Sequence, residues 1–356
     1  MRTGIQLMAL LLAVGCSGGD AAPARTEVVL DSAEAALGEL DFVTGLAELP
    51  DGRVVIGQGQ VPSVLFADLE TGEVDTVGRA GDGPGEYRFP GELHRFGDQV
   101  RMFDFGPRRL TTWNADGSLA GSVSVATVPG FAIAFDTIGY MYAEQPTTQG
   151  FVVTGQEMDS TRSKDSTYIY RYRPNESARD TVGRLFEIGY EIVRIGDGIA
   201  RMRPLYQSAD QWGVLPDGML WILRGRENRV DRRTVDGTWI LGPVRAWEPI
   251  ATTEADRQKL GPFRGMAGDS VERNLPPEKG PFIDAEAAPD GEVWARLNQP
   301  AGYTRELYAI HPVAGVPERV VSLPKDHRVR AISDRSVYVT HEDENGFQVL
   351  ERYRRP

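Results

Sequence analysis

Residues 75–90 decide the fold, and they read D-T-V-G-R-A-G-D-G-P-G-E-Y-R-F-P. A β-prone segment with an Asp-Gly turn precedes this stretch, and another β-prone segment follows it. Its first five residues recur letter for letter at positions 180–184. A peptide that repeats in the same local context is typical of a chain built from repeated units. We therefore interpret the stretch as the joint between two copies of one unit.

Turns rich in Asp and Gly divide the chain into short apolar or alternating segments, which predicts many short strands. The strands of the first copy are predicted at 43–49, 53–56, 63–66 and 73–77. Five further copies contain the turns or strands near residues 97, 131, 216, 289 and 334. Units of roughly 40–47 residues with four strands each are typical of a β-propeller. The sequence thus predicts an all-β, six-bladed propeller over residues 26–356.

Two segments are longer than the repeat requires. Residues 186–206 contain Gly-Asp-Gly and could hold an extra hairpin, so a seventh blade stays open as an alternative. Residues 252–260 combine an N-cap threonine, early acids and late bases, which predicts a short helix. Four prolines follow this helix. We expect residues 252–282 to form an insertion over one mouth of the ring.

The two ends of the chain predict how the ring closes. The sixth unit stops after its third strand, at the C-terminal residues. Residues 27–30 are β-prone and have no hairpin partner nearby, so we expect them to supply the missing fourth strand. Closure of this kind removes an exposed sheet edge. Deletion of residues 26–31 should then destabilise the whole protein.

The first residues indicate export and lipid attachment. A mostly apolar run, too short to span a bilayer, ends in L-A-V-G-C at Cys16. This ending resembles the bacterial lipobox. The alternative is an ordinary secretory signal with an incidental cysteine. We predict a signal peptide at 1–15, a lipidated Cys16 that binds the membrane, and a flexible tether at 16–25. The expected location is the cell envelope, at the outer membrane or the periplasmic face.

Composition excludes several classes of function. The net charge of −12 and the pI near 5.0 argue against a nucleic-acid partner. A single cysteine excludes an intrachain disulfide. The glycine-rich stretch lacks the Gly-Lys-Ser/Thr ending of a phosphate loop, and no G-x-S-x-G elbow is present. The histidines at 94, 311, 327 and 341 show no metal-ligand spacing. No catalytic residue and no cofactor-binding residue is predicted.

With these repeats and the segment G-D-G-P-G-E-Y at 81–87, the chain resembles the bacterial six-bladed β-propeller lipoproteins, relatives of the NHL-repeat propellers. The strand at 102–104 and the closing strands between 338 and 353 belong to the same resemblance. It covers nearly all of residues 26–356. The resemblance implies a fold and a location at the cell envelope, and it does not imply an activity.

Four acidic residues begin or precede the predicted inner strands of different units: Asp41, Glu92, Asp210 and Asp284. Their oxygens could converge at one mouth and hold Ca²⁺, the arrangement that a resemblance to calcium-dependent lactonase propellers implies. Acidic residues are also common at turns in a chain with 51 of them. The leading hypothesis is a non-catalytic module that binds a protein, peptide or carbohydrate or acts as a scaffold. The alternative is a metal-dependent lactonase or lyase, so whether the chain is an enzyme stays open.

Overall fold

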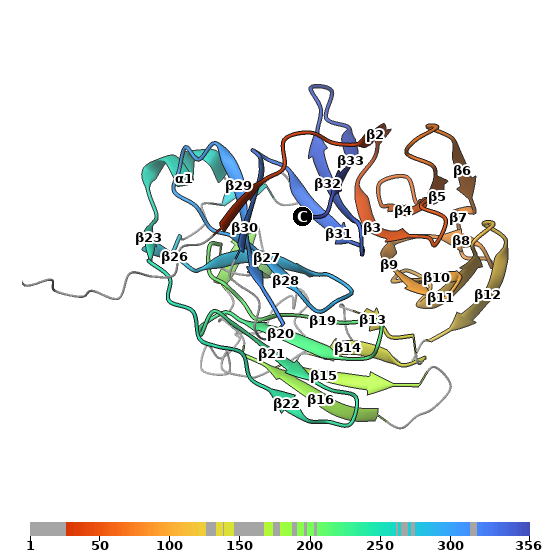
Figure 1. Ribbon diagram of the computed structural model, residues 1–356, viewed down its shortest axis with the longest axis horizontal. Coiled ribbons are helices and arrows are strands. Elements are labelled where there is room, and N and C mark those ends of the chain that lie inside the picture. The colour runs from red at the N-terminus through yellow and green to blue at the C-terminus, as the bar shows by residue number, and fades with distance from the viewer. Residues whose placement is uncertain are drawn as a thin grey trace, which may run out of the picture.

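The computed structural model is a β-propeller of six blades whose inner strands surround one axis (Figure 1). The structure describes residues 26–125, 133–137, 139–145, 167–173, 179–186, 191–195, 198–202, 205–260, 263–264, 270–271, 275–313 and 319–356. Each blade contains four antiparallel strands, to which blade five adds an outer parallel strand, and in the first five blades the order of the four strands from the axis outward follows the sequence. The predicted fold class is confirmed.

The first three blades occupy the N-terminal half of the chain. Blade one contains β3 (Val43–Glu48), β4 (Val54–Gln58), β5 (Ser63–Ala67) and β6 (Val74–Val77). Blade two contains β9 (Pro90–Phe96), β10 (Gln99–Asp104), β11 (Arg109–Asn114) and β12 (Leu119–Ser124). Blade three contains β13 (Ile133–Phe135), β14 (Met141–Gln145), β15 (Thr167–Tyr172) and β16 (Arg179–Leu185).

The last three blades follow the same plan. Blade four contains β19 (Gln211–Val214), β20 (Leu220–Arg224), β21 (Arg229–Arg233) and β22 (Trp239–Ile240). Blade five contains β27 (Phe282–Ala287), β28 (Val293–Leu297), β29 (Arg305–His311) and β30 (Arg319–Pro324). Blade six contains β31 (Arg328–Ile332), β32 (Ser336–Glu342), β33 (Gln348–Arg354) and β2 (Ala35–Leu40).

The Asp-Gly turns form the hairpins for a local reason. The carboxylate of Asp217 accepts a hydrogen bond from the N–H of Met219 at 2.9 Å, and Gly218 takes a left-handed φ of 86°. Asp51 and Asp116 make the same bond to the residue two positions on, at 3.1 and 2.9 Å. Aspartate holds its own turn, and glycine adopts positive φ without a side-chain clash. The core lies between the hairpin sheets, where apolar faces of neighbouring blades pack together.

The strand that closes the ring is not the one that the sequence predicted. β2 pairs with β33 and becomes the outer strand of blade six. The predicted closing segment instead forms β1 (Thr26–Val29), which pairs in parallel with β30 as a fifth strand of blade five. Closure by an N-terminal strand is confirmed, but the segment lies eight residues later. Both segments can form strands, and only the long-range pairing distinguishes them.

The two long segments hold small elements outside the blades. β17 (Glu191–Ile195) and β18 (Gly198–Met202) pair as two antiparallel strands, which do not make a seventh blade. The predicted helix is present as α1 (Glu254–Leu260). Short two-residue strands flank it: β23 (Ile250–Ala251), β24 (Phe263–Arg264), β25 (Ser270–Val271) and β26 (Glu278–Lys279). No described helix has the length and apolar character that crossing a membrane requires.

A buried ion pair ties the helix α1 to the strand β26. The ammonium of Lys279 lies 2.6 Å from the carboxylate of Asp256, and the two side chains are 2% and 4% exposed. Hydrogen bonds from Lys279 to the carbonyl of Gln299 and from Thr253 to Asp256 complete the contact. Because both charges are buried and paired, the helix is held by side chains as well as by its short strands.

Residues 75–90 connect blade one to blade two, as predicted. The connection contains β7 (Arg79–Ala80) and β8 (Glu86–Tyr87), which pair in parallel. Gly78 has a φ of 74°, and a Cβ there would lie 2.2 Å from the carbonyl oxygen of Gly85. Only glycine fits this position. Tyr87 is fully buried in the core between the two blades, so the joint also helps to pack them.

Candidate binding site at the ring centre

Two of the four predicted metal ligands, Asp41 and Asp210, serve the local backbone. The carboxylate of Asp41 accepts hydrogen bonds from the N–H groups of Gln60 and Val61 at 3.1 and 2.5 Å. Asp210 accepts bonds from two backbone N–H groups and lies 2.8 Å from the guanidinium of Arg224. Its side chain is 3% exposed. Both carboxylates therefore already have structural partners.

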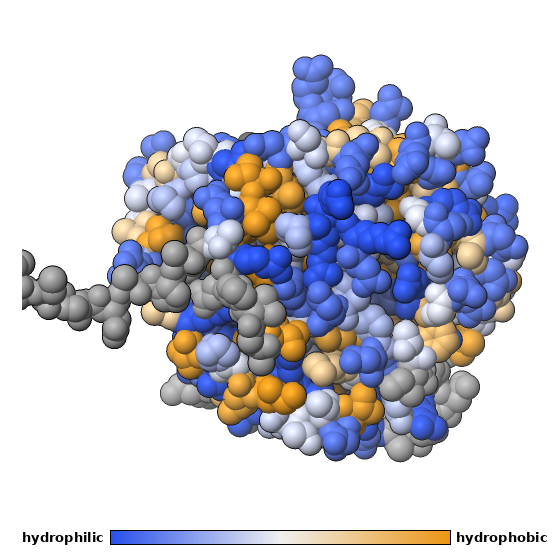
Figure 2. Space-filling model, viewed as in Figure 1, coloured by the Kyte–Doolittle hydropathy of each residue, from blue (hydrophilic) through white to orange (hydrophobic). Residues whose placement is uncertain are grey.

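The other two, Glu92 and Asp284, belong to a charged cluster at the inner strands. We call this set the ring-centre cluster; it consists of Glu92 on β9, Asp284 and Glu286 on β27, and Arg328 and Arg330 on β31. The charges of the other four residues all act on the carboxyl of Glu286. Three blades thus contribute ionisable side chains to one region. Figure 2 shows strongly hydrophilic residues gathered over the middle of the ring.

Within this cluster, Asp284 is held by arginines. Its carboxylate lies 3.4 Å from Arg328 and 3.7 Å from Arg296. Arg296 also bonds at 3.1 Å to Glu306, which is 1% exposed. Burial opposes the charge of Arg296, but the hydrogen bond to Glu306 together with the nearby charges of Asp284 and Glu306 outweighs it and raises the pKa of the guanidinium. Asp284 is therefore part of a permanent ion-pair chain between blades five and six.

Glu286 is the residue with the most perturbed proton affinity in the cluster. Loss of solvent raises its pKa to about 8, and the negative charges of Glu92 and Asp284 act in the same direction. Arg328 and Arg330 offset only part of this effect. Protein atoms surround the side chain, yet it keeps some contact with solvent. A carboxyl in this state is mostly protonated at neutral pH and ionises when a cation approaches.

The two arginines of β31 differ in their freedom. Burial, together with the nearby charge of Arg328, lowers the pKa of Arg330, and its guanidinium donates a hydrogen bond to the carbonyl of Val43. Arg328 is 45% exposed and contacts Asp284. Glu92 is 71% exposed and faces His94, whose Nε2 is 3.8 Å away. The accessible ionisable groups of the cluster are therefore Glu92, Glu286 and the outer part of Arg328.

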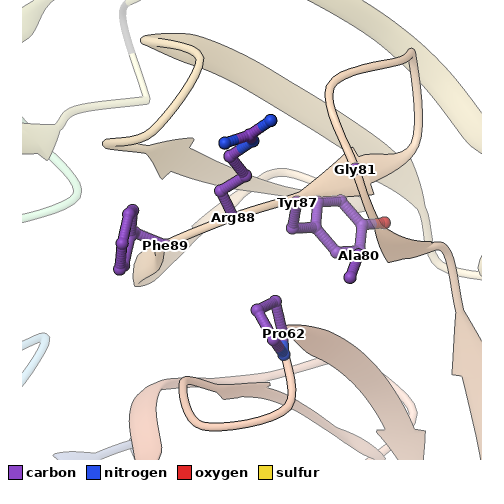
Figure 3. A pocket seen from close by; sticks show the side chains of 6 residues that line it. All are labelled: Pro62, Ala80, Gly81, Tyr87, Arg88 and Phe89. Atoms are coloured by element: carbon purple, nitrogen blue, oxygen red, sulfur yellow. The ribbon is translucent and has the colours of Figure 1, made fainter.

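An apolar pocket lies in the connection between blades one and two. Its volume is about 440 Å³. Figure 3 shows its lining, which consists of Pro62, Ala80, Gly81, Tyr87, Arg88 and Phe89. Phe89 is 64% exposed and directly precedes β9, the strand that carries Glu92. Three residues of extended chain separate Phe89 from Glu92, a distance of about 10 Å. An apolar pocket and an acidic group thus lie within reach of one small ligand.

The described residues do not bring Asp41, Glu92, Asp210 and Asp284 together as a metal site. The one group of three metal-binding side chains among those residues lies in blade six. Sequence reasoning missed Glu286, which follows Asp284 by two residues on the same face of β27. The sequence did contain a signal for Glu286. Side chains alternate between the two faces of a strand, so residues 284 and 286 lie on the same face.

Three solved structures illustrate what the fold resembles. A member of the DUF4221 family from Bacteroides vulgatus is 8% identical, with 91% of this chain and 98% of that chain covered and a TM-score of 0.53. A calcium-binding protein, regucalcin, from Agrobacterium tumefaciens is 11% identical, with coverage of 92% and 95% and a TM-score of 0.45. Virginiamycin B lyase from Staphylococcus aureus is 11% identical, with coverage of 88% and 98% and a TM-score of 0.42.

No protein-family model and no curated protein sequence matches the chain. Because the identities are low, the likeness to the DUF4221 protein shows the fold alone. The chain is thus a six-bladed propeller whose structural neighbours are bacterial proteins. These neighbours include a lyase, a calcium-binding protein and a member of a family named only by number, so they do not point to one function.

Proposed function

We propose that the chain is a propeller that binds a ligand at the ring centre. A lipid on Cys16 holds this propeller at the cell envelope. The observation that carries the proposal is the convergence of side chains from three blades around Glu286. Ionisable groups with shifted pKa values that meet at the centre of a scaffold are typical of functional sites. Ion pairs with Arg296 and Arg328 account for the carboxylate of Asp284, but no ion pair among the described residues accounts for the carboxyl of Glu286.

The chemistry of the site favours a ligand with a cationic group. Glu92 and Glu286 are the acidic groups not bound by an arginine at ion-pair distance among the five residues of the cluster. An ammonium or guanidinium placed between them would stabilise the ionised form of Glu286. The neighbouring pocket would take an apolar side chain beside Phe89. A short peptide or amine with an apolar group about 10 Å from its cation fits both parts.

The outer edge of blade four supports attachment to a membrane. An apolar segment there leaves β22 and runs towards β23, with exposed large side chains at Trp239, Ile240, Leu241, Val244 and Trp247. Leu241 and Val244 are 63% and 65% exposed. Trp side chains prefer the boundary between lipid and water. We call this segment, residues 239–247, the apolar edge.

The N-terminal strand begins beside the apolar edge. The guanidinium of Arg245 donates a hydrogen bond at 3.0 Å to the carbonyl of Ile310, and Ile310 pairs with Arg319. Thr26, the first residue of β1, pairs with the same Arg319. The tether from Cys16 reaches roughly 17 Å. A lipid on Cys16 would therefore hold this edge of the ring close to the bilayer.

Binding to a cationic probe tests the proposal. We would titrate the purified protein with the tripeptide Lys-Gly-Phe amide and follow the heat of binding. Saturable binding that weakens about tenfold in Glu286→Gln and in Phe89→Ser is expected, because each change removes one part of the site. Glu-Gly-Phe amide is the control peptide. Equal binding of the two peptides, or equal binding by the variants, would refute the proposal.

A second candidate function is catalysis at the same place. A carboxyl with a pKa of about 8 is close to the value that suits a general acid or base at neutral pH. This form of the hypothesis needs no metal, unlike the calcium-dependent alternative predicted from the sequence. A screen of lactone and ester substrates, with Glu286→Gln as the control, tests it. Turnover that survives in Glu286→Gln would rule out this role.

A further inference from the structure

Two histidines and a glutamate meet at the seam between blades five and six. His327 precedes β31, His341 lies near the end of β32, and Glu351 lies on β33. The Nε2 atom of His327 is 3.3 Å from one carboxylate oxygen of Glu351, and that of His341 is 3.7 Å from the other. The side chains are 15%, 23% and 18% exposed. One ligand atom of each residue lies within 4.8 Å of the other two.

Strand register explains the meeting of residues that are far apart in sequence. Arg328 pairs with Thr340, so the next pair outward is His327 with His341. Glu351 pairs with Val339, two residues from His341, and therefore lies on the same face of the sheet. Val339 belongs to the core that packs blade six against blade five. The three side chains thus continue this packed face towards its polar end.

Hydrogen bonds fix the orientation of both rings. The Nδ1 atom of His327 is 3.0 Å from the carbonyl oxygen of Lys325, and that of His341 is 3.3 Å from the carbonyl oxygen of Glu342. A carbonyl only accepts hydrogen bonds, so these two contacts favour the tautomer with the proton on Nδ1. In the neutral rings, each Nε2 then directs a lone pair towards Glu351. Histidines that bind metals are oriented in this way by their other nitrogen.

This arrangement favours a bound cation. Two lone pairs and a carboxylate repel one another unless positive charge lies between them. Protonation of one ring would supply one positive charge, whereas protonation of both would stack two imidazolium rings at 4.3 Å with a 22° angle between planes. A single metal ion satisfies all three groups at once. The nearby cation of Arg305 is already paired with Asp31 at 2.7 Å.

The geometry and the donor set fit zinc. In a tetrahedral zinc site with bonds of about 2.0–2.1 Å, neighbouring ligand atoms lie about 3.3 Å apart. The Nε2 of His327 lies at this distance from one oxygen of Glu351, and the Nε2 of His341 lies 3.7 Å from the other oxygen. Imidazole nitrogen suits zinc, whereas calcium prefers oxygen ligands only. The hydroxyl of Tyr353 donates a hydrogen bond to Glu351 at 2.7 Å and holds the carboxylate in place. Partial exposure of all three residues leaves room for a water as fourth ligand.

We propose that His327, His341 and Glu351 form a binding site for one Zn²⁺ ion at the seam between blades five and six. The site is separate from the binding of a ligand around Glu286, so either proposal can fail without the other. A zinc ion there would join β31, β32 and β33 and would stabilise the folded chain in proportion to its concentration. The calcium predicted from the sequence involves none of these residues.

The test is a titration of the purified full-length chain, first freed of metal by a chelator, with Zn²⁺ alone. We expect one ion per chain and a higher melting temperature. His327→Gln and His341→Gln should each bind zinc at least tenfold more weakly, and Tyr353→Phe about tenfold more weakly. Glu342→Gln is the matched control, because it removes an exposed acid beside His341 and leaves the site intact.

Co²⁺ gives an independent measurement if a histidine variant does not fold. Bound to the wild-type chain, it should show the visible absorption of a four-coordinate site with nitrogen ligands, and this absorption should weaken in Tyr353→Phe. Absence of one-to-one zinc binding to the wild type would overturn the proposal. Zinc binding that persists unchanged in both histidine variants, or an equal response to Ca²⁺, would overturn it as well.

Discussion

Asp284 and Arg328 lie on different blades, yet an oxygen of Asp284 is only 3.4 Å from a guanidinium nitrogen of Arg328. This contact joins the inner strands β27 and β31 at the ring centre. It also occupies the carboxylate that the sequence offered as a calcium ligand. Glu286, two residues along β27, has no arginine at ion-pair distance among the described residues and is the group that responds to pH.

Replacement of Glu286 by glutamine should make the protein more stable at high pH. The pKa of this carboxyl rises from 4.5 to about 8 on folding. Between these values the folded state holds a proton that the unfolded state has lost, so stability falls as pH rises. Glu286→Gln removes this loss, and we expect a gain of about 1–3 kcal/mol at pH 8. Melting temperatures of both proteins from pH 5 to 8.5 would show it.

Glu344→Gln is the matched control for this titration. Glu344 lies in the exposed turn between β32 and β33, so its removal should leave the dependence on pH unchanged. Glu92→Gln should lower the pKa of Glu286 only slightly, and so reduce the fall in stability only slightly, since loss of solvent is the larger cause of the shift. If wild type and Glu286→Gln lose stability in parallel as pH rises, Glu286 does not have the raised pKa.

Asp210→Asn should destabilise the chain, and calcium should change the stability of neither the wild type nor the variant. The change leaves Arg224 buried with only Asp231 as its acidic partner, at 2.9 Å. We expect a loss of about 2 kcal/mol in the free energy of unfolding, because a buried charge loses one of its partners. Asp217→Asn, in an exposed turn, should cost less than about 1 kcal/mol. If Ca²⁺ raises the melting temperature of the wild type but not that of Asp210→Asn, the result would instead support the calcium site.

Two truncations distinguish the two N-terminal strands. A chain that begins at residue 32 loses β1, which lies on the outer edge of blade five, and we expect it to fold with a reduced melting temperature. A chain that begins at residue 41 also loses β2 and exposes the edge of β33. We expect this chain to aggregate or to unfold without cooperativity. Circular dichroism during heating measures both, and equal behaviour of the two chains would contradict the observed closure.

The apolar edge should bind bilayers weakly even without the lipid. We would prepare Cys16→Ser and measure its sedimentation with phospholipid vesicles. Leu241→Ser together with Val244→Ser should reduce the bound fraction about tenfold, because two exposed apolar side chains no longer enter the interface. Val74→Ser, an exposed apolar residue of blade one, is the control. Binding that is equal in all three proteins would show that this edge does not face the membrane.

The sequence was sufficient for the blades because their hairpins are local. An aspartate that accepts a bond two residues on, with a glycine at positive φ, marks turns such as Asp51-Gly52 and Asp217-Gly218. The closing strand was assigned wrongly because β1 and β2 have no local partner. Their partners, β30 and β33, lie some 300 residues away, and nothing in either segment specifies a partner at that distance.

The site was less accessible to sequence reasoning. Glu92 and Asp284 were singled out because they begin inner strands, and both do lie at the ring centre. Glu286 was missed because its pKa depends on burial and on charges from two other blades. The pairing of His327 with His341 follows only from the exact register of β31 and β32, which a spacing rule for metal motifs does not contain.

The most direct test of ligand binding at Glu286 is the number of protons released when a cationic probe binds at pH 7. The carboxyl is mostly protonated at that pH, and an adjacent ammonium favours its ionised form. Calorimetric titrations with Lys-Gly-Phe amide in two buffers of different ionisation enthalpy give this number. We expect close to one proton released by the wild type and none by Glu286→Gln. Binding of the peptide by the wild type without release of a proton would contradict a site at Glu286.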